Sequence, residues 1–165
     1  MVYNEKFKVQ SPYCRPTFED VTQQVRETIA RSDVRNGQVL VFTGHTTCSI
    51  QIQEFSDGKS YLGNELIMQD LVTVLSTLVP TCEREHQYLH PCQAHVDTAA
   101  AERDELPAWC LNTDAHLRSV IMGRSVTIPI IDGAVQLGEF GCIYFGDWDQ
   151  IRARERTVIV QVIGE

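Results

Sequence analysis

The chain has 165 residues, a formal net charge of −8 and 43% apolar residues. This length allows one domain with a proper core, and the ordinary composition excludes the disordered and collagen-like classes. The acidic balance argues against binding along a nucleic-acid backbone, which needs a clustered basic face.

No apolar run is long enough to span a membrane, and the N-terminal segment has no apolar stretch typical of a signal peptide. The six cysteines form no CxxC pair. We therefore expect a soluble cytoplasmic protein in which most cysteines are small buried apolar residues rather than disulfide partners.

Residues 1–44 predict a strand, a helix and a second strand. Residues 3–11 alternate apolar and charged side chains, as an edge strand does. Residues 17–32 show a helical apolar stripe that includes Phe18, and Thr17 with Asp20 makes a capping-box pattern. An Asn-Gly turn at residues 36–37 then indicates a buried strand up to residue 44.

The stretch from Gly44 to Asp57, GHTTCSIQIQEFSD, predicts a strand with two unlike faces, because successive side chains of a strand point to opposite sides. The alternate apolar residues suit a core. The other face carries only side chains that can form hydrogen bonds: His45, Thr47, Ser49, Gln51 and Gln53.

The second half of the chain adds two helices and a strand-rich end. Residues 65–80 predict an amphipathic helix with Val74 and Leu78 on its inner side, and residues 81–112 a long irregular loop of the kind that is usually functional or mobile. The remaining elements are a short helix at 112–123, a hairpin at 125–137 around Asp132-Gly133, and strands at 141–149 and 156–165. This pattern predicts a single compact α+β domain over residues 1–165, with a mostly antiparallel sheet and two to three helices.

Three separated histidines are candidate metal ligands: His45, His90 and His116. Three imidazoles at a zinc ion leave an open position for water or substrate. Because the three lie far apart in the sequence, the residues alone favour unrelated histidines. A rival zinc hypothesis uses one short segment, although its spacings match no known zinc motif; its residues are Cys82, His86, His90, Cys92 and His95.

Charged residues give two further candidates. Arg152, Arg154 and Arg156 would share one face of an extended segment, where guanidinium groups could bind phosphate, or could instead keep an edge strand from pairing. Glu54 could act as a general base, a metal ligand or the group that orients a histidine. Asp114 suits the first turn of a helix and needs no further role.

Taken together, the motifs resemble one family. The run GHTTCSIQIQE is similar to its His-Thr-Thr stretch leading to Asn-Glu-Asn-x-Asp, and LVP followed by YLH is similar to its Val-Pro and Tyr-x-His. The segment NTDAHLRSVIMGRSVTIPIIDGAVQLG resembles its Asn-x-Asp-Ala-His, Gly-x-Ser and Gly-x-Leu-x-Leu-Gly run, and the terminal Gly-Glu is shared. The chain thus resembles, over nearly its whole length, the YjbQ family, often described as secondary thiamine-phosphate synthase.

The resemblance implies an α+β homotrimer with a polar pocket near the subunit boundaries, its floor being the polar face that starts at His45. It implies a divalent metal, zinc or, for a transferase, magnesium, bound by His45, His90 and His116. The expected catalytic residues are Glu54 and Arg152. The expected substrate-binding residues are Thr46, Thr47, Asn112, Asp149 and Arg154.

The implied activity is a thiamine-phosphate-synthase-like transfer, possessed as a weak or side activity, on a small phosphorylated or anionic ligand. Alternatives are a zinc-type hydrolase of a phosphorylated or lactone metabolite and a non-catalytic metal- or ligand-binding trimer. The chain departs from the family pattern at Gln53 and Phe55, where asparagines are usual, and in the segments GEFG and DQIR.

Overall fold

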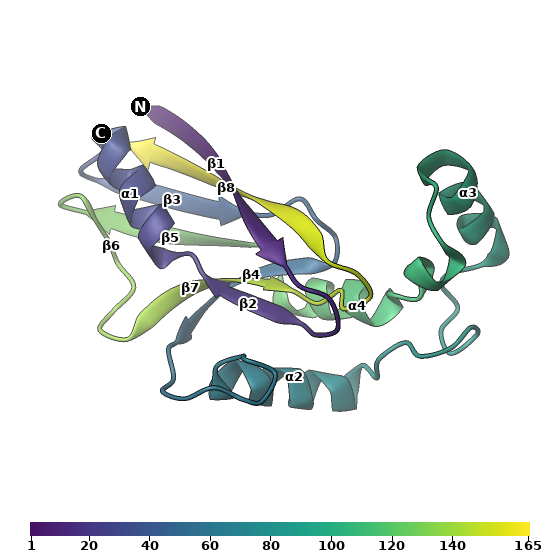
Figure 1. The fold of residues 1–165 in the computed structure, drawn as a ribbon. Helices are drawn as coiled ribbons and strands as arrows, with labels where there is room; N and C mark the ends of the chain where they lie inside the picture. Colours follow the sequence, from purple (N-terminus) through teal and green to yellow (C-terminus); the bar gives the residue numbers. More distant parts are fainter.

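The structure, a computed structural model, describes residues 1–165 and contains two antiparallel β-sheets stacked on each other (Figure 1). The strand order is β1-β8-β3-β5-β6 in the larger sheet and β2-β7-β4 in the smaller one. The strands are β1 (Val2–Ser11), β2 (Thr17–Asp20), β3 (Gly37–Phe42), β4 (Cys48–Glu54), β5 (Ser125–Ile131), β6 (Ala134–Val135), β7 (Gly141–Asp147) and β8 (Arg154–Gly164). All strand pairs are antiparallel, so the predicted α+β class is confirmed.

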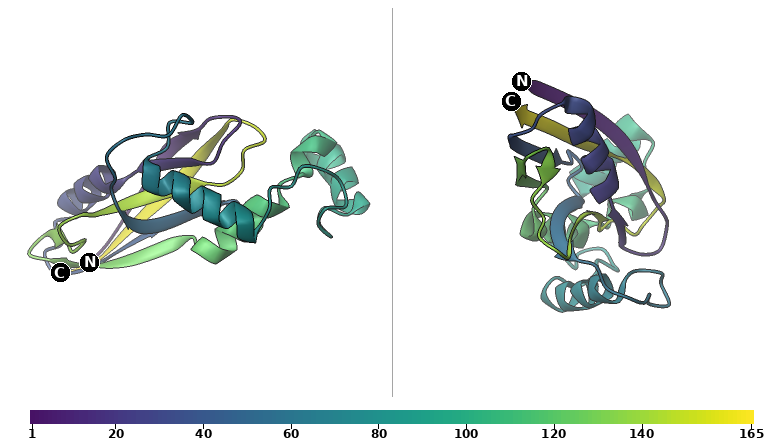
Figure 2. Two further views of the ribbon diagram at one scale, coloured as in Figure 1. Left: turned by 90° about the horizontal axis from the view of Figure 1, so that it is seen from below. Right: turned by 90° about the vertical axis from the view of Figure 1, so that its left-hand side faces the viewer.

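Four α-helices and one short 3₁₀ helix complete the domain. They are α1 (Thr22–Ser32), α2 (Leu66–Leu78), α3 (Gln93–Arg103), η1 (Pro107–Cys110) and α4 (Thr113–Met122). Helix α2 covers the smaller sheet on the side away from the larger one, whereas α3 stands apart at one end of the molecule (Figures 1 and 2). None of these helices has both the length and the apolar character needed to cross a membrane.

The main core lies between the two sheets and α1. It is built largely from β-branched residues, which suit strands that are covered on one face. A second, smaller cluster surrounds Trp148, against which Val72 and Leu75 of α2 and Ala115 of α4 pack. Trp148 and Phe18 meet edge to face, with ring centroids 5.1 Å apart. This second cluster fixes α2 and α4 onto the smaller sheet.

Several predicted elements are confirmed. β1 is an edge strand that pairs only with β8. The hairpin turns at Asp132 and Gly133, whose positive φ angles of 52° and 78° suit the predicted tight turn. Helix α4 begins after Asn112 and ends before Gly123. No cysteine forms a disulfide; three are fully buried, Cys142 is half-buried and two are exposed.

The helix predicted to begin at Thr17 begins at Thr22 instead. Residues 17–20 form β2, which pairs with β7, and Phe18 packs on Trp148 rather than on a helical stripe. The Asp20 carboxylate accepts the backbone N–H of Thr22 at 2.8 Å, so Asp20 serves the start of the helix from outside it. The strand pairing outweighs the local helical pattern because it bonds backbone groups of the segment to β7 and places Phe18 against Trp148.

Two other predictions need correction. In α2 the buried residues are Met68, Val72 and Leu75, whereas Val74 and Leu78 face solvent. The segment 81–112 is not a structureless loop, since it contains α3 and η1. Helix α3 carries strong helix formers but buries only Ala99, so its sequence offers no apolar stripe from which a helix could be recognised.

The polar face predicted from His45 onward divides in two. The strand itself begins at Cys48, and Cys48 and Ile50 enter the main core as expected. The hydroxyl of Ser49 accepts the indole N–H of Trp148 at 2.9 Å and donates to the Gln51 side chain at 2.9 Å, both groups being buried. Ser49 therefore satisfies the indole of a buried tryptophan and Gln51 accepts from Ser49, so these two side chains are engaged inside the protein and do not face a ligand.

Candidate functional site

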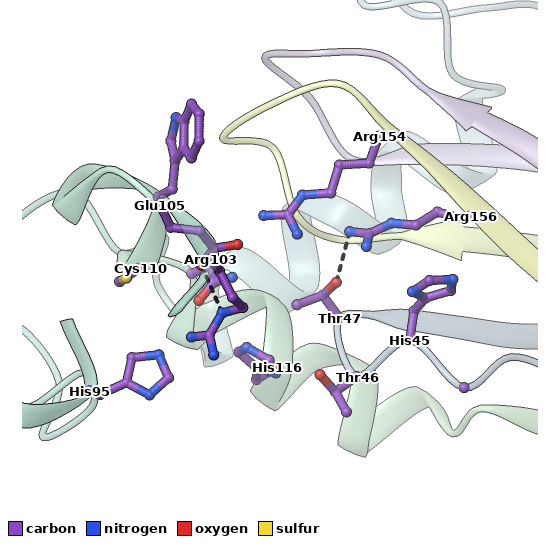
Figure 3. A pocket seen from close by; sticks show the side chains of 13 residues that line it. His45, Thr46, Thr47, His95, Arg103, Glu105, Cys110, His116, Arg154 and Arg156 are labelled. Carbon is purple, nitrogen blue, oxygen red and sulfur yellow. Dashed lines mark hydrogen bonds and ion pairs between the residues drawn. The ribbon is translucent and has the colours of Figure 1, made fainter. Parts of the chain in front are cut away.

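A cavity of about 360 Å³ lies where the β3–β4 turn, the start of β8, the start of α4 and the α3–η1 segment meet (Figure 3). We refer to residues 91–111, which contain α3 and η1, as the arm. The cavity is lined by Gly44, His45, Thr46, Thr47, His95, Arg103, Glu105, Trp109, Cys110, Asn112, His116, Arg154 and Arg156. Most of these side chains are charged or hydrogen-bonding, so the cavity suits a polar ligand.

The turn between β3 and β4 is fastened to β8. The Thr43 hydroxyl donates to the carbonyl of Thr157 at 3.0 Å, and the backbone N–H of Thr157 donates to Nε2 of His45 at 3.0 Å. In this arrangement Nε2 of His45 is an unprotonated acceptor. Burial lowers the pKa of His45, and the Arg156 charge lowers it further, which keeps the acceptor neutral. These contacts hold Thr46 and Thr47 at the cavity wall.

Behind the cavity wall lies a buried network of two arginines and two aspartates. Arg156 donates to Asp147 at 2.7 Å and to the Thr47 hydroxyl at 3.1 Å. Arg154 lies 2.9 Å from the Asp149 carboxylate, which also accepts the Asn112 side-chain amide at 3.4 Å. Both aspartates are almost completely buried, and each is matched by an arginine as buried charges require.

The two aspartates neutralise the inner sides of Arg154 and Arg156, but the side facing the cavity remains cationic. Arg103 of the arm also lines the cavity, and Glu105 is the only carboxylate among the lining residues (Figure 3). The Nε of Arg154 is buried and has no hydrogen-bond partner, so one donor of this network is unsatisfied. The excess of donors over acceptors favours an anionic ligand.

His95 of the arm and His116 of α4 line the other side of the cavity, and His90, which precedes the arm, lies close to both. The His90 and His95 ring centroids are 4.6 Å apart, and those of His90 and His116 are 6.0 Å apart. The Thr113 hydroxyl donates to the His90 carbonyl at 2.6 Å, which ties the loop that contains His90 to α4. Burial lowers the pKa values of His90 and His116, and for His90 the two neighbouring histidines add to the effect. Both are thus kept neutral near pH 7.

The three histidines predicted to share a metal ion do not surround one point. His90 and His116 are neighbours, but Nε2 of His45 is engaged with the backbone of β8. No group of three His, Cys, Asp or Glu side chains is arranged to hold a metal ion. His95, which the resemblance does not include, is the histidine that stands beside His90.

The predicted substrate-binding residues gather at the cavity, whereas the two predicted catalytic residues lie outside its lining. Thr46, Thr47, Asn112 and Arg154 line it, and Asp149 stands directly behind. Glu54 is exposed at the far end of β4, so a role as general base has no geometric support.

Arg152 does not line the cavity itself but contacts two residues that do. Its guanidinium group lies 4.2 Å from the centre of the Trp109 ring and pairs with Glu105. The alternative of a solvated basic edge strand is wrong for Arg154 and Arg156, because both side chains are largely buried in ion pairs with Asp149 and Asp147.

Of the lining residues of the arm, only His95 was predicted from the sequence, and only as part of the rival zinc site; the others are Arg103, Glu105, Trp109 and Cys110. Asp147, the partner of Arg156, was not predicted either. The signals of function in the segment 81–112 were its length and its histidines and cysteines. No pattern in the arm shows which of its side chains turn inward, because its helix has no apolar face to set a direction.

The family model described as UPF0047 protein YjbQ-like matches residues 5–165, which is nearly the whole chain. The chain belongs to this YjbQ-like family. A UPF0047 protein of Methanothermobacter thermautotrophicus is 30% identical over 146 residues, covering 88% of this chain and 82% of the relative. A UPF0047 protein of Archaeoglobus fulgidus is 31% identical over 144 residues, covering 87% of this chain and 89% of the relative.

Solved structures of the family share the fold. An uncharacterised YjbQ/UPF0047 family protein from Clostridium acetobutylicum superposes with a TM-score of 0.73 at 26% identity, over 96% of this chain and 99% of that one. A hypothetical protein from Aeropyrum pernix gives a TM-score of 0.71 at 26% identity, over 98% of each chain. These likenesses identify the family and the fold, while the names of the relatives assign no activity.

Proposed function

We propose that this YjbQ-like protein binds a small phosphorylated metabolite in the cavity and acts on it as an enzyme similar to secondary thiamine-phosphate synthase. The observation that carries the proposal is the cationic cavity wall formed by Arg103, Arg154 and Arg156. Guanidinium groups bind phosphate oxygens through paired hydrogen bonds, and a partly buried site strengthens such bonds.

The wall suits a reaction in which phosphate or pyrophosphate departs. Thiamine-phosphate synthesis couples a pyrimidine pyrophosphate to a thiazole phosphate and releases pyrophosphate. Its barrier is the departure of the leaving group, on which negative charge develops. Fixed donors aimed at that charge stabilise the transition state more than the ground state. Arg154 and Arg156 are held in fixed positions by Asp149 and Asp147, so they need little rearrangement when the charge appears.

Replacing Arg154 with methionine is expected to weaken pyrophosphate binding by at least about tenfold, because a charge-assisted donor pair of about 1.5–3 kcal/mol is lost. Isothermal titration calorimetry with inorganic pyrophosphate measures the change. The matched control is Arg124→Met, which removes the same charge from an exposed position outside the cavity and should leave the affinity within about twofold.

Equal losses in the two variants would mean that only net charge matters, and the cavity would not be the binding site. If pyrophosphate binds as expected but no phosphorylated substrate turns over, the non-catalytic ligand-binding alternative replaces the enzymatic one.

We further propose that the site binds a divalent metal ion. The ion would be zinc if the protein is a hydrolase and magnesium if it is a transferase. The observation that favours zinc is that the imidazole of His90 lies close to those of His95 and His116, which both line the cavity. A third ligand would require His95 to rotate or His45 to leave its bond with Thr157. In the present arrangement three ligands do not come together.

The metal proposal predicts about one zinc ion per chain in protein purified without a histidine tag, and its loss in His116→Ala. Elemental analysis after dialysis against zinc measures both. His86→Ala is the control, since His86 is exposed and lies outside the cavity. A wild-type protein that takes up no zinc would contradict the proposal and leave the arginine wall as the only ligand-binding feature.

We also propose that the chain assembles as a homotrimer, which the family resemblance implies. Helices α2 and α4 bury one face each around Trp148, yet both present further large apolar side chains to solvent. The exposed fractions are 65% for Val74, 68% for Leu78 and 77% for Val120. Apolar surface of this kind on neighbouring helices is typical of a protein interface.

We propose the cytoplasm as the location of the protein, because its six unpaired cysteines would remain reduced there.

A further inference from the structure

Glu105 lies between two arginines at the edge of the cavity. Its carboxylate pairs with Arg152, and its second oxygen lies 3.6 Å from Nε of Arg103. Arg152 is held from the other side by the Trp109 ring at 4.2 Å. Arg103, Glu105 and Trp109 belong to the arm, whereas Arg152 precedes β8, so the cluster joins two parts of the molecule (Figure 3 shows Arg103 and Glu105).

The surroundings of Glu105 are those expected around a bound anion. Burial tends to raise the pKa of Glu105, but the hydrogen bond and charge of Arg152, with the charges of Arg103 and Arg154, lower it overall. The carboxylate is therefore ionised at neutral pH. It is also the only negative group among the residues that line a cavity rich in arginine and histidine.

We propose that the Glu105 carboxylate occupies an anion subsite made by Arg103 and Arg152, and that the phosphate group of the ligand displaces it. The displaced carboxylate moves to solvent, and both arginines exchange a monoanionic partner for a dianionic one. This inference rests on the proposed function of the cavity, and it adds a specificity-determining residue to that site.

Displacement by phosphate is favourable because a phosphate offers more charge and a third acceptor oxygen. A ligand carboxylate offers the same charge as Glu105 but must compete with a group that the chain keeps nearby at high effective concentration. Glu105 thus weakens the binding of carboxylate ligands but still allows phosphates to bind. Only two residues of the arm are buried, Ala99 in α3 and Cys110 in η1, so a shift of the Glu105 side chain disrupts little packing.

The test compares the wild type with Glu105→Gln, using inorganic pyrophosphate and acetate as separate probes in isothermal titration calorimetry. Removal of the internal competitor is expected to tighten pyrophosphate binding by about tenfold, since like charges facing each other in a site weaken binding strongly. Acetate, which should not bind the wild type measurably, should bind the variant. The matched control is Glu102→Gln, which removes the same charge from an exposed position on α3 outside the cavity.

Three other calorimetric results would contradict the inference, and each has a different meaning. Weaker pyrophosphate binding in Glu105→Gln would mean that Glu105 holds the arginines in place for the ligand. Equal binding in the wild type, Glu105→Gln and Glu102→Gln would place the anion elsewhere in the cavity and overturn only the inference. If neither the wild type nor Glu105→Gln binds pyrophosphate, the proposed function fails with it. Circular dichroism of both variants, with Glu105→Ala as a second replacement, verifies that folding is unchanged.

Discussion

Replacing Arg156 with methionine is expected to lower the free energy of unfolding by about 3–5 kcal/mol, the usual cost of breaking a buried ion pair from one side. Asp147 is completely buried and accepts from Arg156 at 2.7 Å, so the variant would leave an uncompensated carboxylate inside the protein. The hydroxyl of Thr47 would lose a donor as well. Urea denaturation followed by circular dichroism measures the change.

Arg35→Met is the matched control for Arg156→Met. Arg35 also faces an aspartate, Asp132, but both side chains are largely exposed and 3.7 Å apart. Its loss should cost less than about 1 kcal/mol. The double variant with Asp147→Asn should recover part of the loss seen for Arg156→Met, since no charge would then remain unpaired. A single variant as stable as the wild type would show that the network contributes nothing to the fold.

Replacing Val120 with aspartate is expected to convert the proposed trimer into monomers without unfolding the domain. Val120 is 77% exposed on α4, so an aspartate there is harmless to an isolated chain. In an interface the same carboxylate would be buried against apolar groups without a partner, which costs several kcal/mol per contact. Sedimentation equilibrium at micromolar protein concentrations measures the mass.

Ile131→Asp is the control for the change at Val120. Ile131 is 52% exposed, but it lies at the hairpin tip of β5 rather than on α2 or α4. This variant should keep the mass of the wild type. A wild type that sediments as a monomer would contradict the trimer outright, and a trimer that survives Val120→Asp would place the interface on another face.

The segment Asp147-Trp148-Asp149 links the site to the surface proposed for assembly. The two aspartates pair with the arginines of β8, whereas Trp148 between them enters the cluster formed by α2 and α4. The backbone N–H of Asp149 donates to the Asp147 carboxylate at 3.0 Å just after β7 ends, which fixes the two aspartates relative to each other. Contacts made by α2 and α4 with another chain would therefore act on the very segment that positions the arginine wall.

The site was predictable in part because some of its members carry local patterns. Thr46, Thr47, Asn112 and Arg154 belong to motifs that resemble a family, and the structure brings them to one cavity. Arg152 belongs to the same motif as Arg154, but at two residues before β8 it turns to Trp109 instead. Sequence spacing alone does not predict that the Arg152 side chain points elsewhere. Arg152 lies before β8, so the alternation of side chains along that strand, which places Arg154 and Arg156 on one face, does not apply to it.

What the sequence determined by itself is the class of the fold, most strands, the position of α4 and the hairpin at Asp132-Gly133. These features depend on alternation, on capping residues and on turn chemistry, all of which act between residues near each other in the chain. The tertiary structure alone decided that residues 17–20 pair with β7, that His45 binds the backbone of β8, and that Glu105 lies between Arg103 and Arg152. Each of these depends on contacts between distant segments. The free energies of these contacts come from strand pairing, burial and charge in the folded chain, and no local sequence pattern predicts them.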